Sequence, residues 1–318
     1  MATYAVGVDV GGTKVLAVAV PAPGSGASPA QILASAEVPT PGGTDAVLDA
    51  VVGTVHRVLD GVGAASATVG IGLPGLVDVA GVLRYGPNLP GVLDADIGGM
   101  LRDRLGAALE GGTVAVDNDG NCAALAEARL GAAAGAGSAL FIGLGTGIAC
   151  GIVIDGRLWR GAHGFAGEPG HMCVDPTGPR CACGAVGCWE AVASGTALDR
   201  IARSFGADGA AELTDAERNG APDPEGRRSA ALDGFAAAVA SGLVGLCNVV
   251  DPAVVVLGGS VMGAADVLLP RIVRSCEALR FGGPRGARPD VRVATLGRTA
   301  GAVGAALLPV DDQPGAAG

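Results

Sequence analysis

The segment YAVGVDVGGTKVLAVAV, residues 4–20, sets the pattern on which the rest of the chain is built. Residues 4–10 and 15–20 are valine-rich apolar runs, so a β-hairpin is expected, with a glycine turn between them. The glycines expose backbone N–H groups that can form an anion-binding nest. The turn also supplies a hydroxyl and a cation; its residues are Asp9, Gly11, Gly12, Thr13 and Lys14. The spacing is not that of a Walker motif, and an ordinary hairpin turn fits equally well.

Residues 139–155, ALFIGLGTGIACGIVID, repeat this design around a second glycine-rich turn. A dinucleotide-binding fingerprint is not expected, because Ile148 stands where the third glycine should be and a strand follows. Two such units, each opening half of the chain, predict a duplicated α/β domain with a cleft between the copies. The second turn, with Gly145, Thr146 and Gly147, would then hold nucleotide phosphates together with the first turn.

The sequence DNDGN, residues 117–121, follows the expected strand 113–117 and leads into an expected helix, Cys122 to Leu130. Two acids and two amides at a strand-to-helix junction lie where polar side chains can meet a ligand. Helix N-capping is the alternative, but it would use only one of these residues. The composition of the junction therefore favours a binding site.

Other strand ends carry weaker signals. The run 68–72 leads into Gly75, and ligands lie at such strand ends in open α/β sheets. Asn88 could bond to a hydroxyl pair, although a turn asparagine is as common. The buried run 252–260 contains Gly258 and Gly259, which would let a flat base or ribose approach the backbone.

The loop 161–195 concentrates the metal-binding residue types of the chain. Its sulfur and nitrogen ligands are those of tetrahedral zinc: His171, Cys181, Cys183 and Cys188. A disulfide between Cys181 and Cys183 is disfavoured, because their side chains would point apart in an extended chain. Four protein ligands leave no open position, so structural zinc is favoured over catalytic zinc. The metal-bound loop would fix the positions of two carboxylates, Glu168 and Glu190, that could bind a polyhydroxyl ligand.

Composition excludes some functions. A net charge of −10 without a densely basic stretch argues against nucleic-acid binding. No apolar run is expected to span a bilayer, and the N-terminus carries no positive charge before Lys14, unlike a secretory leader. The cysteines are therefore expected in a reducing compartment. Residues 208–228 are polar and are expected to form a surface region, followed by an apolar helix at 229–249.

Taken together, the motifs resemble the ROK sugar kinases of the actin/hexokinase superfamily, most closely their glucokinase branch. The ordered set is far more specific than any single glycine turn, and the resemblance covers nearly the full length of the chain. Its pieces are DVGGTK (9–14), GLPG (72–75), DNDGN (117–121), LGTG (144–147), GEPGH (167–171), CACGAVGCWE (181–190) and LGGS (257–260).

The resemblance implies an actin-like ATPase (ribonuclease H-like) fold with two α/β domains and an interdomain cleft. A small domain would comprise residues 1–117, completed by a C-terminal helix at 301–310. A large domain would comprise residues 118–300 and contain the zinc-binding loop 168–190. Sugar would bind in the cleft, and the domains would close on it.

The resemblance also implies roles for individual residues. Asp119 would be the catalytic base that takes the proton from the sugar 6-hydroxyl as this oxygen attacks the γ-phosphate of ATP. Sugar would be bound by Gly75, Asn88, Asn118, Asp119, Glu168, His171 and Glu190. ATP would be bound by Asp9, Gly11, Gly12, Thr13, Lys14, Gly145, Thr146, Gly147, Gly258 and Gly259, with Mg²⁺ on the phosphates and Asp9 its candidate ligand. Structural Zn²⁺ would be held by His171, Cys181, Cys183 and Cys188.

The expected activity is ATP-dependent phosphorylation of glucose, in the cytoplasm, by a homo-oligomer of two or four chains. Other hexoses stay open (N-acetylmannosamine, fructose or allose), because His163 and Pro169 depart from the family pattern beside the sugar loop. The family also contains sugar-sensing repressors, but their N-terminal helix-turn-helix domain has no place before a turn that begins at Asp9. A silent sugar-binding protein is disfavoured by Asp119, and polyphosphate as donor is disfavoured by the cysteine cluster.

Overall fold

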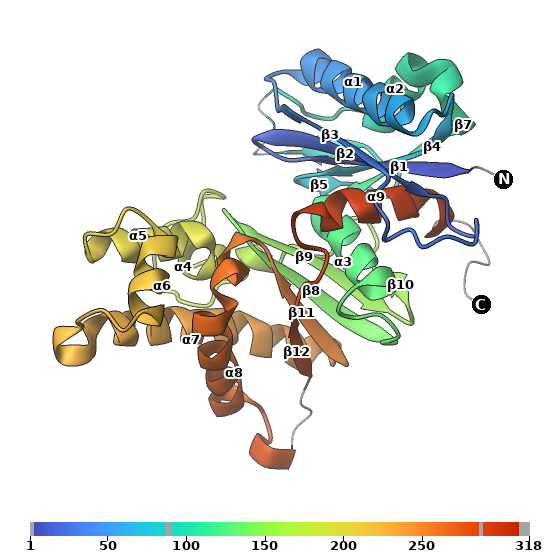
Figure 1. The fold of residues 1–318 in the computed structure, drawn as a ribbon. Helices are drawn as coiled ribbons and strands as arrows, with labels where there is room; N and C mark the ends of the chain where they lie inside the picture. Colours follow the sequence, from blue (N-terminus) through green and yellow to red (C-terminus); the bar gives the residue numbers. More distant parts are fainter. Residues whose placement is uncertain (1–2, 87–88, 90, 286–288, 312–318) are drawn as a thin grey trace. The chain divides into compact units, whose positions relative to one another are not determined.

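The structure is a computed structural model that describes residues 3–86, 89, 91–285 and 289–311. The chain divides into two compact units, each of which draws on separate parts of the sequence. Unit 1 comprises residues 1–138, 151–167 and 295–318. Unit 2 comprises residues 139–150 and 168–294. The ribbon is shown in Figure 1.

Unit 1 is built on a five-stranded sheet with the order β3-β2-β1-β4-β7. The strands are β1 (Tyr4–Val10), β2 (Lys14–Pro21), β3 (Ala34–Pro39), β4 (Ala67–Leu73) and β7 (Leu109–Asn118). The expected hairpin is confirmed, because β1 and β2 are antiparallel and Val10 is paired with Val15 across the turn. Strands β4 and β7 continue the sheet in parallel with β1, so their carboxyl ends and the glycine turn lie at one edge.

Helices cover both faces of this sheet (Figure 1). On one face lie α1 (Thr44–Val62) and α2 (Ile97–Leu105); on the other lie α9 (Ala300–Asp311) and α3 (Asp119–Leu130). Helix α9 contacts the sheet closely, because a Cβ at Gly7 or Gly70 would overlap a backbone carbonyl oxygen of α9. The chain has few aromatic residues. At Gly7 and Gly70, the helix therefore packs directly against the backbone of the sheet, with no large side chain between them. A small antiparallel pair, β5 (Leu76–Val77) and β6 (Leu83–Tyr85), follows β4.

The second five-stranded sheet has the order β10-β9-β8-β11-β12. Its strands are β8 (Ser138–Leu144), β9 (Ile148–Ile154), β10 (Arg157–Leu158), β11 (Val254–Gly258) and β12 (Asp290–Val293). Strands β8 and β9 flank the second glycine turn, and β11 runs parallel to β8, as β4 runs parallel to β1. The predicted duplication is therefore visible in the topology.

The division into units differs from the expected boundary after Asp117. Helix α3 belongs to unit 1, since it packs against α9. Residues 151–167 also belong to unit 1, although the chain on either side of them belongs to unit 2. A boundary read from the order of motifs along the sequence could not include such an excursion.

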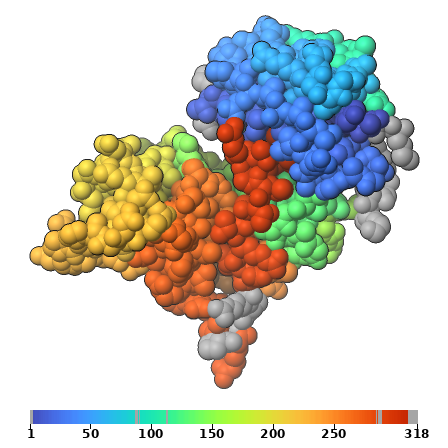
Figure 2. Space-filling model, in the orientation of Figure 1, coloured from blue at the N-terminus to red at the C-terminus, as the bar shows by residue number. Residues whose placement is uncertain are grey.

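Unit 2 also contains most of the remaining helices. They are α4 (Trp189–Ala193), α5 (Gly195–Ser204), α6 (Ala210–Arg218), α7 (Arg227–Val250) and α8 (Ala265–Leu279). Helix α6 lies within the stretch 208–228, for which the sequence predicted a surface region and no helix. The segment does lie at the surface of unit 2, as the yellow part of Figure 2 shows. Its helix is secured by buried Leu213 and Thr214.

The apolar helix expected at 229–249 is confirmed as α7. By length and composition alone, the helical stretch Pro224–Val250 could cross a membrane, which contradicts the expectation that no run is long enough. Core helices meet the same criterion, and α7 packs against α4 and α8 within unit 2. The composition of α7 therefore does not assign it to a membrane.

Candidate active site

The first glycine turn is closed by hydrogen bonds that leave its outer side exposed. The backbone N–H of Gly11 donates to the carbonyl of Lys14 at 2.8 Å. Thr40 fixes the same turn from the end of β3: its hydroxyl donates to the carbonyl of Gly11 at 2.6 Å, and its N–H donates to the carbonyl of Thr13 at 3.1 Å. Gly12 and Thr13 are exposed, so an anion could reach their N–H groups.

Lys14 at this turn is held by a carboxylate that sequence reasoning missed. Its ammonium nitrogen lies 3.5 Å from the carboxylate of Glu37 on β3. Glu37 also accepts a hydrogen bond from the guanidinium of Arg298, which precedes α9. Two cations from opposite ends of the chain are therefore gathered beside the turn. Only the fold brings these three residues together.

Asp9, at the end of β1, packs against the start of α9. A Cβ added at Gly301 would lie 2.8 Å from the carboxylate carbon of Asp9. Burial raises the pKa of Asp9 to about 6, and the charge of Lys14 opposes this rise. An oxygen ligand in such a desolvated place is suited to a hard cation.

At the strand-to-helix junction 117–121, one residue caps α3, and several polar side chains also lie close together. The side-chain oxygen of Asn118 accepts hydrogen bonds from the N–H groups of Gly120 (2.8 Å) and Asn121 (3.3 Å), so Asn118 is the N-cap of α3. Its amide nitrogen donates to the carbonyl of Gly75 at 3.0 Å. Asp119 accepts a hydrogen bond from the N–H of Gly120 at 2.8 Å. Both predicted residues therefore lie at the positive end of the α3 dipole.

Gly75 has a structural reason to be glycine. Its φ is +113°, a conformation that side chains rarely adopt, and a Cβ there would overlap the carbonyl oxygen of Tyr85. The carbonyl of Gly75 meets Asn118, so the turn after β4 and the junction after β7 are joined. Asn88, which was predicted beside them, lies outside the described residues.

The second glycine turn is held by the start of α5. Gly145 donates its N–H to the carbonyl of Gly147 at 3.0 Å and accepts from the N–H of Gly195 at 2.7 Å. The hydroxyl of Thr196 donates to the carbonyl of Thr146 at 2.7 Å. The residues 195–196 therefore support this turn, as Thr40 supports the first one.

The predicted sugar-binding carboxylates of the loop lie close to this turn. Glu190 accepts a hydrogen bond from the N–H of Ile148 at 2.9 Å. Burial raises the pKa of Glu168; the nearby His171 opposes the rise and the charge of Glu190 adds to it. The Nε2 atom of His171 lies 4.0 Å from a carboxylate oxygen of Glu168. Glu168, His171 and Glu190 thus form one polar group within unit 2.

The four predicted zinc ligands are brought together. The ligand atoms of His171, Cys181, Cys183 and Cys188 all lie within 4.8 Å of one another. The Sγ atoms of Cys183 and Cys188 are 3.6 Å apart, and Nδ1 of His171 lies 3.9 Å from Sγ of Cys181. Ligands of tetrahedral zinc at about 2.3 Å would be separated by roughly 3.8 Å, so the spacing fits this ion. The soft donor set also matches zinc.

The end of the cysteine loop is anchored in the core of unit 2 by Trp189. This side chain is fully buried, and its indole N–H donates to the carbonyl of Ala238 on α7 at 2.9 Å. Gly242 on α7 faces the indole so closely that a Cβ there would overlap the ring. The next residue after Trp189 is Glu190, so the anchor places a predicted sugar ligand.

The glycines at the end of β11 are accounted for by packing on β8. Gly259 has a φ of +84°, and a Cβ there would overlap the carbonyl oxygen of Leu144. A Cβ at Gly258 would lie 2.8 Å from the ring of Phe141. These contacts explain the glycines without a ligand, and the nucleotide role predicted for them remains a prediction.

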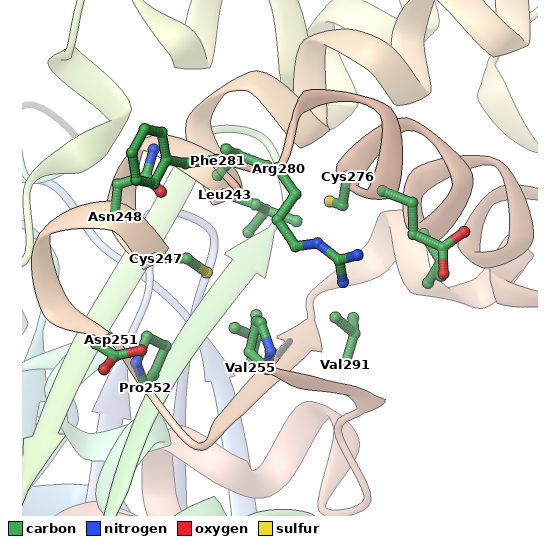
Figure 3. A pocket seen from close by; sticks show the side chains of 14 residues that line it. Leu243, Cys247, Asn248, Asp251, Pro252, Val255, Cys276, Arg280, Phe281 and Val291 are labelled. Atoms are coloured by element: carbon green, nitrogen blue, oxygen red, sulfur yellow. The ribbon is translucent and has the colours of Figure 1, made fainter. Parts of the chain in front are cut away.

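A separate hollow of about 310 Å³ lies between α7, α8, β11 and β12 (Figure 3). It is mainly apolar, and it also contains Cys247, Cys276 and Arg280. Among the described residues that line it, there is no predicted site residue. The predicted residues lie elsewhere, one group in unit 1 (Asp9 to Lys14, Gly75, Asn118 and Asp119) and one group in unit 2 (Gly145 to Gly147, Glu168, His171, Glu190, Gly258, Gly259 and the cysteines).

Comparisons with known proteins match nearly the whole chain. The model of the ROK family matches residues 5–311. A glucokinase from Streptomyces coelicolor is 36% identical over 325 aligned positions, covering 97% of this chain and 98% of the relative. The structure of a ROK family glucokinase from Streptomyces griseus, in complex with glucose and AMPPNP, superposes with a TM-score of 0.81 at 32% identity, covering 95% of this chain and 98% of that one. A ROK hexokinase from Thermus thermophilus has a TM-score of 0.76 at 36% identity, covering 96% and 97%.

Proposed function

The chain belongs to the ROK family, and from this premise we propose that it is an ATP-dependent hexose kinase that phosphorylates glucose. The observation that carries the proposal is the similarity, over nearly the whole of both chains, to glucokinases, one of which was solved with glucose and an ATP analogue. The two five-stranded sheets are consistent with the actin-like ATPase fold of the family.

Asp119 is proposed as the catalytic base. In phosphoryl transfer, the enzyme mainly positions reactants and stabilises charge. The 6-hydroxyl oxygen of glucose forms a bond to the γ-phosphorus of ATP while the bond from this phosphorus to the β,γ-bridging oxygen breaks, and the hydroxyl proton passes to the carboxylate of Asp119. The products are glucose 6-phosphate and ADP. The two glycine turns are proposed to bind phosphates, and Gly258 and Gly259 to line the adenosine site.

Magnesium is proposed to accompany ATP, where it would neutralise phosphate charge. Asp9 is the residue proposed to hold this ion, directly or through water. The carboxylate of Asp9 is desolvated, and the charge of Lys14 favours its ionised form, which is the form that binds a cation. Lys14 alone is little positive charge for a nucleotide in a chain with a net charge of −10.

Glucose is proposed to be bound by Asn118 and Gly75 in unit 1 and by Glu168, His171 and Glu190 in unit 2, with Asn88 a further candidate. Structural zinc is proposed on His171, Cys181, Cys183 and Cys188. The distances above support a double role for His171: Nδ1 is near the sulfur atoms, whereas Nε2 is near Glu168. Metal binding through one ring nitrogen would then fix the other nitrogen for sugar.

A coupled assay over a panel of hexoses tests the proposal. We expect ATP-dependent turnover with the highest kcat/KM for glucose, compared with N-acetylmannosamine, fructose and allose, and little turnover when polyphosphate replaces ATP. Absence of nucleotide consumption with every hexose would overturn the proposal. Preference for a different hexose would leave the assignment as a kinase in place and would change the proposed substrate. We further propose that the enzyme acts in the cytoplasm as a dimer or tetramer, without nucleic acid or membrane.

A further inference from the structure

Asp117 is a buried carboxylate whose oxygens are occupied by three donors. Its side chain is 5% exposed. One oxygen accepts hydrogen bonds from the N–H of Asn118 and from the amide nitrogen of Asn121, both at 2.7 Å. The other oxygen accepts from Nε of Arg160 at 2.6 Å. Asp117 therefore fixes the backbone at the point where β7 ends and α3 begins, directly before Asp119.

Arg160 comes from the short excursion of the chain, residues 151–167, that belongs to unit 1. Its carbonyl accepts a hydrogen bond from the N–H of Ala166 at 3.1 Å, which closes the loop 160–166. This loop is packed onto the end of β5, because a Cβ at Gly164 would lie 2.5 Å from the carbonyl oxygen of Val77. Arg160 thus reaches Asp117 from a supported loop and not from a free surface strand.

Several acidic groups share the surroundings of Arg160. Burial raises the pKa of the Cys122 thiol well above its usual range, and the charges of Asp117, Asp9 and Asp119 raise it further, in that order. The charge of Arg160 opposes them. Lys14 acts on Asp9 from the neighbouring turn. Carboxylates from β1, β7 and α3 therefore all act on the Cys122 thiol, and the charge of Arg160 opposes their effect there.

We propose that Arg160 is a positioning residue for catalysis: its ion pair with Asp117 holds the start of α3, and its charge offsets the acidic groups around Asp119. The proposal rests on the proposed function, in which Asp119 is the base. An uncompensated buried carboxylate at position 117 would take up a proton or draw in water, and either change would disturb its bonds to Asn118 and Asn121. The extra negative charge near Asp119 would also disfavour its ionised form.

Two variants separate the charge of Arg160 from its hydrogen bond. Arg160→Gln keeps a donor and removes the charge, whereas Arg160→Lys keeps the charge on a differently shaped side chain. Arg157→Gln is the matched control, because Arg157 is an exposed cation three residues away on β10. Each variant is assayed for kcat, for KM of glucose and of ATP, and for the pH dependence of kcat, and its melting temperature (Tm) is recorded.

We expect Arg160→Gln to lower kcat about 10- to 100-fold, as a small displacement of a catalytic group does, and to change KM for ATP little. The acid limb of the kcat profile should move to higher pH, and Arg160→Lys should restore part of kcat and most of the profile. Arg157→Gln should match the parent enzyme. A lower Tm with an unmoved pH profile and normal kcat for the folded fraction would overturn the proposal, as would an equal shift in the Gln and Lys variants. Failure of the proposed function is distinguishable, since the parent enzyme itself would then consume no ATP with any hexose, whereas failure of the present proposal leaves the parent enzyme active.

Discussion

The start of α3 and the cysteine loop both present predicted sugar-binding side chains, but different interactions hold them in place. At the start of α3, every support is supplied by the chain itself: Asn118 caps the helix and reaches Gly75, and Asp117 is paired with Arg160. In the loop, the described ligand atoms of His171 and the three cysteines meet mainly one another. The first region is organised by hydrogen bonds within the chain, whereas the second has the donor set and spacing of the proposed zinc site.

This difference separates two ways of losing activity. A change at the start of α3 should affect the chemical step, because its geometry does not depend on a metal. A change at the cysteine loop should affect sugar binding first, because Glu168, His171 and Glu190 lie on or beside it. The predictions below test this separation, beginning with the largest expected effect.

Asp119→Asn should remove turnover while the protein stays folded. Replacing the carboxylate by an amide removes the proton acceptor, so we expect kcat to fall about 10³-fold. The Gly120 N–H bond can be kept by the amide oxygen, so Tm and glucose binding should stay near those of the parent enzyme. Steady-state kinetics measure the fall in kcat, and titration of the protein with glucose by calorimetry measures glucose binding.

Asp155→Asn is the control for this change. Asp155 is exposed in the turn before β10 and has a φ of +51°, which asparagine adopts readily. It should keep full activity. Near-parental turnover of Asp119→Asn would remove Asp119 from its role, and loss of glucose binding in that variant would break the separation between the two regions.

Removal of metal, by chelation or by Cys183→Ser, should act on the other region. We expect KM for glucose to rise roughly 10- to 100-fold, because the ring of His171 would lose its support, with a smaller change in KM for ATP. Metal content by plasma spectrometry should fall from one zinc per chain to below one in the variant. Cys173→Ser is the matched control, since Cys173 lies in the same loop outside the ligand group. An unchanged KM after complete loss of zinc would contradict the proposed coupling.

The two regions also differ in how far the sequence could predict them. The proposed zinc ligands lie within eighteen positions of one another (residues 171–188), so spacing and residue type predict the cluster that the structure brings together. The hairpins and the duplicated topology were predictable for the same reason, because apolar β-branched runs on either side of a glycine turn are local signals.

The supports of the α3 start were not predictable in this way. Arg160 is 43 residues from Asp117, and Gly75 is 43 residues from Asn118. Such pairs depend on which strands become neighbours, and no periodicity in the sequence encodes that. The sequence also could not decide between a cap and a ligand for Asn118, because the amide is suited to both, and the structure shows that it caps α3. The expected domain boundary stays a prediction; the compact units differ from it, since residues 151–167 belong to unit 1.

Gly242→Ala tests how the metal loop is fastened to its unit. The added methyl group would overlap the indole of Trp189, so we expect the free energy of unfolding to fall by about 1–3 kcal/mol. KM for glucose should rise modestly, because Glu190 follows Trp189. Gly245→Ala on the same helix is the control: nothing lies within 4 Å of its Cβ, and it should be neutral or stabilise α7 by up to about 1 kcal/mol. Equal stability of the two variants would show that Trp189 does not anchor the loop.

The smallest expected effect concerns Asp9: the charge of Lys14 acts on this buried carboxylate, whereas Asp117 is paired with the guanidinium of Arg160. Burial raises the pKa of Asp9 from 3.8 to about 6, so the native state binds this proton more tightly than the unfolded state does. Stability should therefore fall as pH rises from about 4 to 6, and Asp9→Asn should remove this part of the decline.

In the absence of metal, we expect Asp9→Asn to have a higher free energy of unfolding than the parent at pH 7, by on the order of 1 kcal/mol, and about the same value at pH 4. Thermal melts across this range measure the difference, with Asp155→Asn as the exposed control. If Asp9→Asn lost stability at pH 7, Asp9 would be a compensated carboxylate like Asp117, and the contrast between these two neighbours would disappear.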